Sequence, residues 1–244
     1  MATTDDQTAI NQEKIAAFDE DFKSVEQNDR LNFIRKVFGI LSVQLALTAG
    51  MVGMVKSNEE WNRNVYWNGA GWCWACFTFA IISELMILCN RKLARKVPIN
   101  YVLLLVFTLS FAYIVTFICT GYPTEVVVAA TAMTAGITLA LTVYALTTKK
   151  DFTYMGGMLW VMGMTIFMTA MFGFWFYYSE VYNLLLCSLC VILYGLYLIY
   201  DVQLVAGGGR HKLDMDDYII GALIIYIDII NLFLTILRML GSRR

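Results

Sequence analysis

Residues 217–240 read DYIIGALIIYIDIINLFLTILRML, an apolar stretch of membrane-spanning length with Asp228 near its middle. A helix that crosses a bilayer needs about 20 mostly apolar residues. Six upstream stretches meet the same requirement, at 37–55, 70–89, 101–119, 126–147, 154–174 and 183–205. Backbone groups in lipid must bond within a helix or a closed barrel, and these stretches lack the alternation of barrel strands. The sequence therefore predicts an all-α polytopic membrane protein with seven transmembrane helices.

The composition supports a membrane protein and excludes several other classes. Of 244 residues, 59% are apolar and 15% are charged, whereas soluble domains average about 45–50% and about 25%. A net charge of −1 creates no field that would attract polyanions. An ordinary soluble enzyme, a disordered protein and a nucleic-acid binder are thereby excluded, and the lipid bilayer is the expected partner.

The chain divides into a polar, acidic tail at residues 1–30 and a transmembrane domain at residues 31–244. The tail has neither the early apolar core of a signal peptide nor the Arg-rich, acid-poor character of a mitochondrial presequence. We expect a solvated, partly disordered cytosolic tail, with the first span acting as an uncleaved insertion signal. This favours the endoplasmic reticulum or Golgi, with the mitochondrial inner membrane as an alternative.

Lysine and arginine set the predicted orientation, because they concentrate on the cytosolic side of membrane proteins. One side receives most of them: Arg30, Arg35, Lys36, Arg91, Lys92, Arg95, Lys96, Lys149, Lys150, Arg210 and Lys212. The N-terminus is therefore expected in the cytosol. Seven crossings place Arg238, Arg243 and Arg244 on the other side, and a re-entrant last segment would return them. The length of 217–240 favours seven crossings.

The six cysteines lie in or beside apolar stretches, as Cys73, Cys76, Cys89, Cys119, Cys187 and Cys190. A zinc site usually combines exposed thiolates with histidines, and His211 is the single histidine. We therefore expect free thiols packed as small apolar groups. No cofactor and no resident metal ion are expected.

Three acids lie inside the predicted spans: Glu84, Asp201 and Asp228. An acid at the centre of a membrane helix costs about 2.5–3.5 kcal/mol and is a functional-site hypothesis by default. Spans six and seven are antiparallel around a glycine-rich connection, with Asp214 as the expected N-cap of the last span. This arrangement could bring Asp201 and Asp228 together in the cytosolic half. Helix packing around a protonated acid is the alternative.

Two carboxyls in contact cannot both ionise cheaply, so they titrate as one unit. A shared proton would hold the two helices together. Its loss would cause repulsion and leave oxygen ligands suited to a hard cation. We therefore expect a pH-responsive ion pathway at Asp201 and Asp228, with calcium held there at most transiently.

Several stretches together resemble the lifeguard branch of the Bax inhibitor-1 family of membrane proteins. They are RKVPIN at 95–100, ATAMT at 130–134, TKKDFTYMGG at 148–157, YDVQL at 200–204 and YIDIINLF at 226–233. The resemblance implies a central last helix surrounded by six others. It also implies a non-enzymatic protein that leaks calcium, the permeant ion, across an internal membrane and suppresses apoptosis.

The resemblance also implies roles for particular residues. The family's paired aspartates, proposed as pH sensor and pore gate, fall on Asp201 and Asp228. A bacterial member has an arginine at the end of span two that contacts the sixth-span aspartate. Ungapped alignment from Glu84 places that arginine at Arg95, with Arg91 nearby. Arg95 is therefore an accessory candidate, together with the intramembrane acid Glu84 and with Asn231, which falls three residues after Asp228 on the same stripe of its helix.

Two alternative functions stay open. Family folds can serve as scaffolds, so the chain could be a non-conducting subunit that assembles with membrane-protein partners. An intramembrane aspartyl protease also places two aspartates on adjacent helices, and Tyr200-Asp201 matches its first motif. Asp228, however, follows Ile225-Tyr226-Ile227 instead of the Gly-x-Gly of such enzymes, which makes the protease a remote alternative.

Overall fold

The computed structural model describes the backbone of residues 4–172, 180–207 and 209–242, and side chains from residue 24 onward. Seven helical segments are long and apolar enough to cross a membrane. They are Ser24–Ser57 within α1 (Thr4–Ser57), α3 (Ala70–Cys89), α5 (Ile99–Thr120), α6 (Thr124–Thr147), Thr153–Phe172, α8 (Glu180–Ala206) and α9 (Tyr218–Gly241). The predicted all-α fold with seven spans is confirmed. The last two residues of the predicted fifth span lie outside the described residues.

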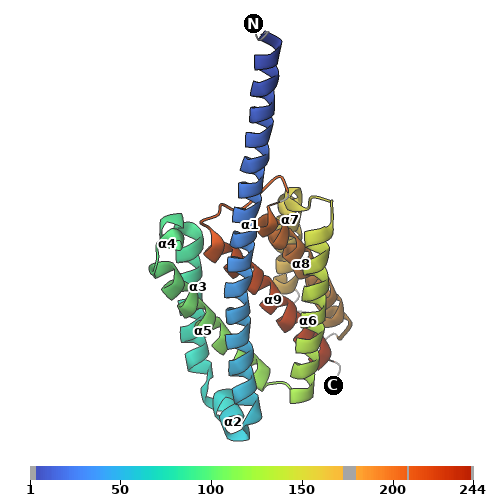
Figure 1. Cartoon of the computed structure of the whole chain (residues 1–244). Helices are drawn as coiled ribbons and strands as arrows, with labels where there is room; N and C mark the ends of the chain where they lie inside the picture. The colour runs from blue at the N-terminus through green and yellow to red at the C-terminus, as the bar shows by residue number, and fades with distance from the viewer. Residues whose placement is uncertain (1–3, 173–179, 208, 243–244) are drawn as a thin grey trace.

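Short helices connect some of the spans. The segment Thr153–Phe172 starts with the 3₁₀ turn η1 (Thr153–Met155), which continues as α7 (Gly156–Phe172). The helices α2 (Glu59–Asn68) and α4 (Arg91–Arg95) lie at opposite ends of the bundle (Figure 1). Asn58 caps α2, because its side-chain oxygen accepts from the backbone N–H of Glu60 at 2.9 Å and of Trp61 at 3.3 Å.

Helix α1 projects well beyond the bundle (Figure 1). Its backbone is helical from Thr4 onward, where the sequence predicted a partly disordered tail. Residues 4–38 contain neither glycine nor proline, so nothing interrupts the helix. Extending an existing helix is far easier than nucleating a new one. The boundary expected at residue 30 therefore falls inside one continuous helix.

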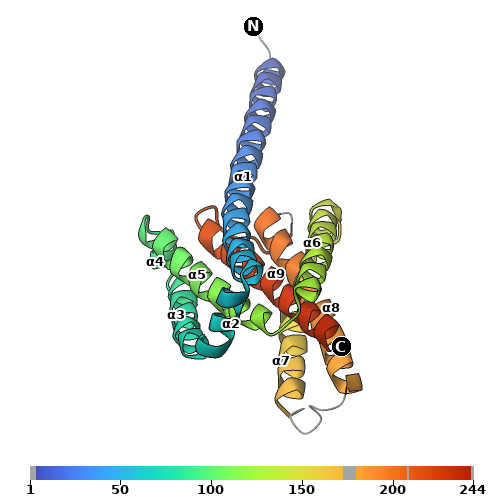
Figure 2. The same cartoon turned by 90° about the horizontal axis from the view of Figure 1, so that it is seen from below.

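Helix α9 lies at the centre of the bundle (Figure 2). In its most apolar stretch 72% of the residues are buried, compared with 17% for α3 and 6% for Thr153–Phe172. Helices α1, α5, α6 and α8 pack against it, whereas α3 packs mainly on α5 and α7 mainly on α8. The predicted central last helix is thus confirmed.

A glycine allows the close approach of helices at the centre. A Cβ atom on Gly221 of α9 would lie 3.0 Å from Val205 and 3.4 Å from Val37. Small residues let membrane helices pack closely, and such packing replaces the hydrophobic effect, which is weak between helices in lipid. The contact therefore draws α9 against both α8 and α1.

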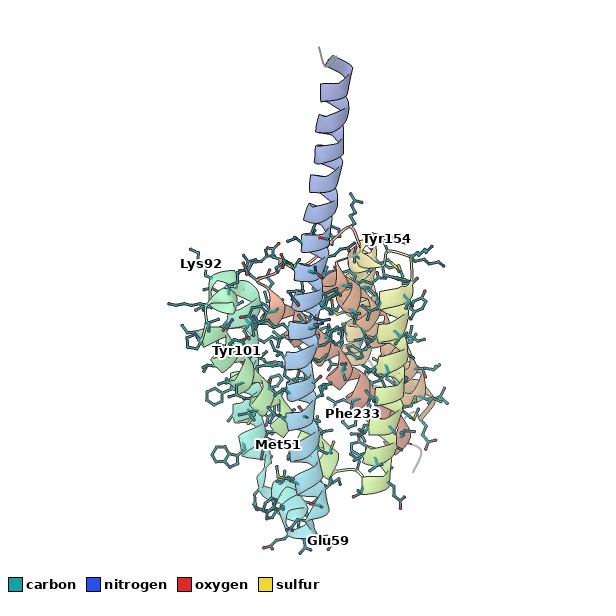
Figure 3. All side chains as sticks on the ribbon, viewed as in Figure 1. Met51, Glu59, Lys92, Tyr101, Tyr154 and Phe233 are labelled. Carbon is teal, nitrogen blue, oxygen red and sulfur yellow. The ribbon has the colours of Figure 1, made fainter. Side chains whose placement is uncertain are left out.

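The two chain ends point to opposite sides of the bundle (Figure 1). Figure 3 shows Lys92 and Tyr154 at the N-terminal end and Glu59 at the other end. Helix α9 crosses the whole bundle, and Arg238 near its end donates a 2.7 Å hydrogen bond to Asn183 Oδ1 at the start of α8. The last segment is therefore a full crossing and not a re-entrant one. Arg243 and Arg244 lie outside the described residues.

This topology predicts that tags on the two termini are exposed on opposite faces of a sealed vesicle. Protease added from outside should digest one terminal tag, and the other should be digested only after permeabilisation. A tag inserted between Lys149 and Lys150, at the N-terminal end, is the control and should follow the N-terminal tag. Digestion of both terminal tags from the same side would contradict seven crossings.

Candidate functional site

The carboxyl groups of Asp201 in α8 and Asp228 in α9 lie close enough together to form a hydrogen bond. Both residues are buried, with 8% and 7% of their surface exposed. An ionised carboxylate only accepts hydrogen bonds, so this bond requires a proton on one of the two groups. The structure therefore brings the two predicted residues together in a geometry that holds a shared proton.

The carboxyl pair lies in the half of the bundle nearer the N-terminal end. At 1.5 Å per residue, Asp201 is roughly 8 Å before the end of α8, and Asp228 is roughly 15 Å past the start of α9. The last span begins at Tyr218 after Asp217, so the expected N-cap at Asp214 is wrong. The helix starts one turn later than expected, and Asp214 and Asp217 both bind an arginine, as described below.

Tyrosines of α8 line the carboxyl pair. Tyr194 and Tyr197 interact electrostatically with Asp228, and Tyr197 and Tyr200 with Asp201. No N–H or hydroxyl of the described residues donates to Asp228 Oδ2, which is buried. A buried acceptor without a donor is unusual. This oxygen is therefore available to share a proton with Asp201.

Two glycines of α7 make room for these tyrosines. A Cβ atom on Gly156 would lie 3.0 Å from the Tyr200 hydroxyl oxygen, and one on Gly163 would lie 3.3 Å from that of Tyr197. The hydroxyls thus point at the backbone of α7. Because the glycines are seven residues apart, they lie on one face of the helix. Helix α7 therefore covers the tyrosine side of the carboxyl pair.

The opposite face of α9 is fixed by polar contacts with α1. Tyr226 lies two residues before Asp228 and so points to roughly the other side of the helix. Its hydroxyl lies 2.8 Å from Thr48 Oγ1, which donates to the Gln44 carbonyl oxygen at 2.9 Å. Tyr226 is therefore the donor to Thr48. The Gln44 side chain in turn donates to Thr108 Oγ1 of α5 at 2.9 Å.

Gln203, two residues after Asp201, ties α8 to the connection between α6 and α7. Its buried side-chain amide accepts from the Phe152 N–H at 2.7 Å. It donates to the carbonyl oxygens of Lys150 at 2.9 Å and Ala145 at 3.3 Å. Sequence reasoning missed this residue, although an amide in the apolar YDVQL stretch was a signal for a buried polar anchor.

Asp151 joins this connection to the glycine-rich segment after α8. One carboxylate oxygen accepts from the hydroxyl and N–H of Thr153 at 2.6 and 2.8 Å, and the other accepts from the Arg210 N–H at 2.7 Å. The Thr153 hydroxyl, followed by the N–H groups of Arg210 and Thr153, holds the pKa of Asp151 below its ordinary value. The junction is thus stabilised by the ionised carboxylate.

A family model described as "Inhibitor of apoptosis-promoting Bax1" matches residues 30–244. Human protein lifeguard 3 is 33% identical over 217 residues, which cover 88% of this chain and 70% of that protein. The chain belongs to the Bax inhibitor/lifeguard family. Mouse protein lifeguard 3 is 31% identical over 96% of this chain and 77% of its own length. Mouse protein lifeguard 4 is 35% identical over 87% and 86%.

The arginine expected to contact Asp201 has other partners in this lifeguard-family chain. Arg95 Nε and Nη2 donate to the Asp217 carboxylate at 2.7 and 2.9 Å, and Nη2 also donates to Asp214 at 2.7 Å. These hydrogen bonds raise the pKa of Arg95 further above its ordinary value. The expected contact between Arg95 and Asp201 is therefore wrong. Arg95 forms two parallel hydrogen bonds with the Asp217 carboxylate, which is only 2% exposed. Such a bidentate pair is stronger than a single hydrogen bond.

The other two accessory candidates are half-buried. Glu84 is half-buried on α3, which packs mainly on α5, and Asn231 is half-buried one turn after Asp228. Accessory roles for both stay predictions. The six cysteines are free, as predicted. Among the residues the structure describes, no three His, Cys, Asp or Glu side chains gather in a way that could hold a metal ion.

The lowered pKa of Asp151 predicts how its contribution to stability changes with pH. A carboxylate with a lower pKa in the folded than in the unfolded protein stabilises the fold above its unfolded-state pKa. That contribution is lost as the pH falls through the folded-state pKa. Asp151→Asn should therefore lower Tm at neutral pH, and the difference from the parent should disappear well below about pH 4. Thermal unfolding in detergent across this range measures it.

Asp216→Asn is the matched control, because Asp216 is exposed in the next part of the same segment. It should leave Tm close to that of the parent at each pH. A Tm difference for Asp151→Asn that persists at acid pH would contradict the assignment of an ionised carboxylate at this junction.

Proposed function

We propose that this protein is a pH-sensitive calcium leak channel of an intracellular membrane, where it modulates calcium homeostasis and restrains cell death. The observation that carries the proposal is the hydrogen bond between the buried carboxyls of Asp201 and Asp228 on adjacent spans. A protonated pair of this kind holds two helices together by a bond that a change in pH can break.

The proposed gate works through the charge of the carboxyl pair. While the proton is shared, Asp201 and Asp228 attract each other and α8 stays packed on α9. When the proton leaves, two anions repel at short range. They then offer carboxylate oxygens, the ligands that calcium prefers. Calcium acts here as a passing ion, held only during transfer, and the leak rises as the pair deprotonates.

Several observations support the cellular part of the proposal. The matched family model is described as an inhibitor of apoptosis-promoting Bax1. Lys92 lies at the end of the bundle from which α1 projects (Figure 3). The neighbouring Arg91 and Arg95 belong to α4 at the same end (Figure 1), which favours a cytosolic N-terminus. The proposed location is the endoplasmic reticulum or the Golgi.

Calcium flux into liposomes that contain the purified protein tests this proposal. Asp201→Asn and Asp228→Asn each keep a polar side chain of similar size but remove one titrating group. Each substitution should flatten the pH dependence of the flux and reduce the flux on the alkaline side severalfold. Asp216→Asn, an exposed acid outside the spans, is the control and should behave like the parent.

An unaltered pH profile in both pair variants would refute the gate. Absence of flux from the parent protein, together with purification at fixed stoichiometry with other membrane chains, would favour the non-conducting subunit instead. Cleavage of a helical substrate that Asp228→Asn abolishes would favour the protease.

A further inference from the structure

The side chain of Arg30, on α1, binds the C-terminal end of α8. Its Nη2 donates to the Leu204 carbonyl oxygen at 2.9 Å and its Nε to that of Ala206 at 3.2 Å. Its Nη1 donates to the Leu213 carbonyl oxygen at 2.7 Å. One guanidinium thus bonds three backbone carbonyls that lie more than 170 residues away along the chain.

This contact meets a need at the end of every helix. The last carbonyls of a helix lack partners within the helix, and a cation there also interacts favourably with the helix dipole. Only arginine carries several donors in one rigid plane. Arg30 therefore satisfies the Ala206 carbonyl at the end of α8 and the Leu213 carbonyl of the following segment. It is also a second donor to the Leu204 carbonyl, which accepts from the Leu213 N–H at 3.1 Å.

Gly207, directly after α8, shows how closely Arg30 is fitted. Its φ of 75° is the left-handed conformation that commonly ends a helix and that glycine adopts without strain. A Cβ atom at this position would collide with the guanidinium of Arg30. The turn after α8 and the Arg30 side chain of α1 are thus packed directly against each other.

Two other side chains of α1 also make contacts near this turn. Lys36 Nζ lies 3.3 Å from the centre of the Tyr218 ring at the start of α9, a favourable cation–π contact. Glu26 pairs with Lys212 at 3.4 Å, but both side chains are more than half exposed, so this pair contributes little. Among these three contacts, that of Arg30 alone reaches the backbone of α8.

We propose that Arg30 is a positioning residue that couples α1 to the carboxyl pair by holding the last turn of α8. Asp201 lies three residues before Leu204, so one helical turn separates the proton-sharing carboxyl from a carbonyl that Arg30 binds. A displacement of this turn moves Asp201 relative to Asp228. The effect on α8 is independent of ion conduction, whereas the effect on the leak rests on the proposed function.

Other charged and titratable groups near this end of the bundle are distributed over several elements. The carboxyl pair faces Tyr194, Tyr197 and Tyr200 of α8. The segment after α8 carries Arg210, His211 and Lys212, and α1 carries Glu26, Asp29, Arg35 and Lys36. Of these, the tyrosines interact electrostatically with the pair. The pH profile of an Arg30 variant must therefore be compared with that of a variant that removes one positive charge elsewhere on α1.

Hydrogen exchange of the full-length protein in lipid nanodiscs tests the coupling. Arg30→Gln should speed exchange of amides in residues 200–213 by about tenfold, because the charged hydrogen bonds to this turn are lost. Arg30→Lys retains the charge with fewer donors and should fall between the parent and Arg30→Gln. Arg35→Gln makes the same charge change at an exposed position of α1 and should exchange like the parent.

Two exchange results would overturn the inference: unchanged exchange in Arg30→Gln, or faster exchange confined to residues 207–213 that does not reach the turn with Asp201. In liposomes, Arg30→Gln should shift the pH midpoint of calcium flux, whereas Arg35→Gln should not. An unshifted midpoint despite faster exchange would overturn the coupling to the gate. Absence of flux from the parent would refute the proposed function instead, and exchange alone would then decide the inference.

Discussion

A carboxyl group inside a bilayer must keep its proton or find a partner for its charge. Asp228 faces this constraint at the centre of the bundle, on the most deeply buried helix. The partner that α8 supplies is a second carboxyl, Asp201. A pair of carboxyls differs from a salt bridge, because the two groups attract each other only while one of them is protonated. Under the proposed function, the packing of α8 on α9 therefore depends on proton binding.

Hydrogen bonds hold the helices on both sides of this contact. On the side of α9 that faces away from the pair, Tyr226 binds Thr48 of α1. At the start of α9, Arg95 binds Asp217. Helix α8 is held near Asp201 by Gln203 and, through its last carbonyls, by Arg30. Hydrogen bonds between membrane helices contribute only about 0.6 kcal/mol on average. Under the proposed gate, repulsion between two buried anions would act against these hydrogen bonds on both helices.

The sequence was sufficient to predict the seven spans, the central last helix and the two aspartates that meet. Each rests on a strong local signal, such as apolar length or an acid in an apolar stretch. The sequence was insufficient to predict the partners of Arg95, which binds Asp214 and Asp217 instead of Asp201. The choice between nearby carboxylates depends on how α4 packs near α9.

The roles of Gln203 and Arg30 could not be predicted either, because both bind backbone carbonyls. Carbonyls occur at every residue, so no residue pattern reveals such partners. The helical start of α1 was missed because the polar composition of residues 1–30 suggested disorder.

The proton shared by Asp201 and Asp228 is the central claim, and infrared difference spectroscopy of the protein in lipid tests it most directly. The account predicts a carbonyl-stretch band from a protonated, hydrogen-bonded carboxyl that disappears as the pH rises. Asp201→Asn and Asp228→Asn should each change this band, because the two groups carry one proton between them. A spectrum without such a band, or a band that either substitution leaves intact, would contradict the account.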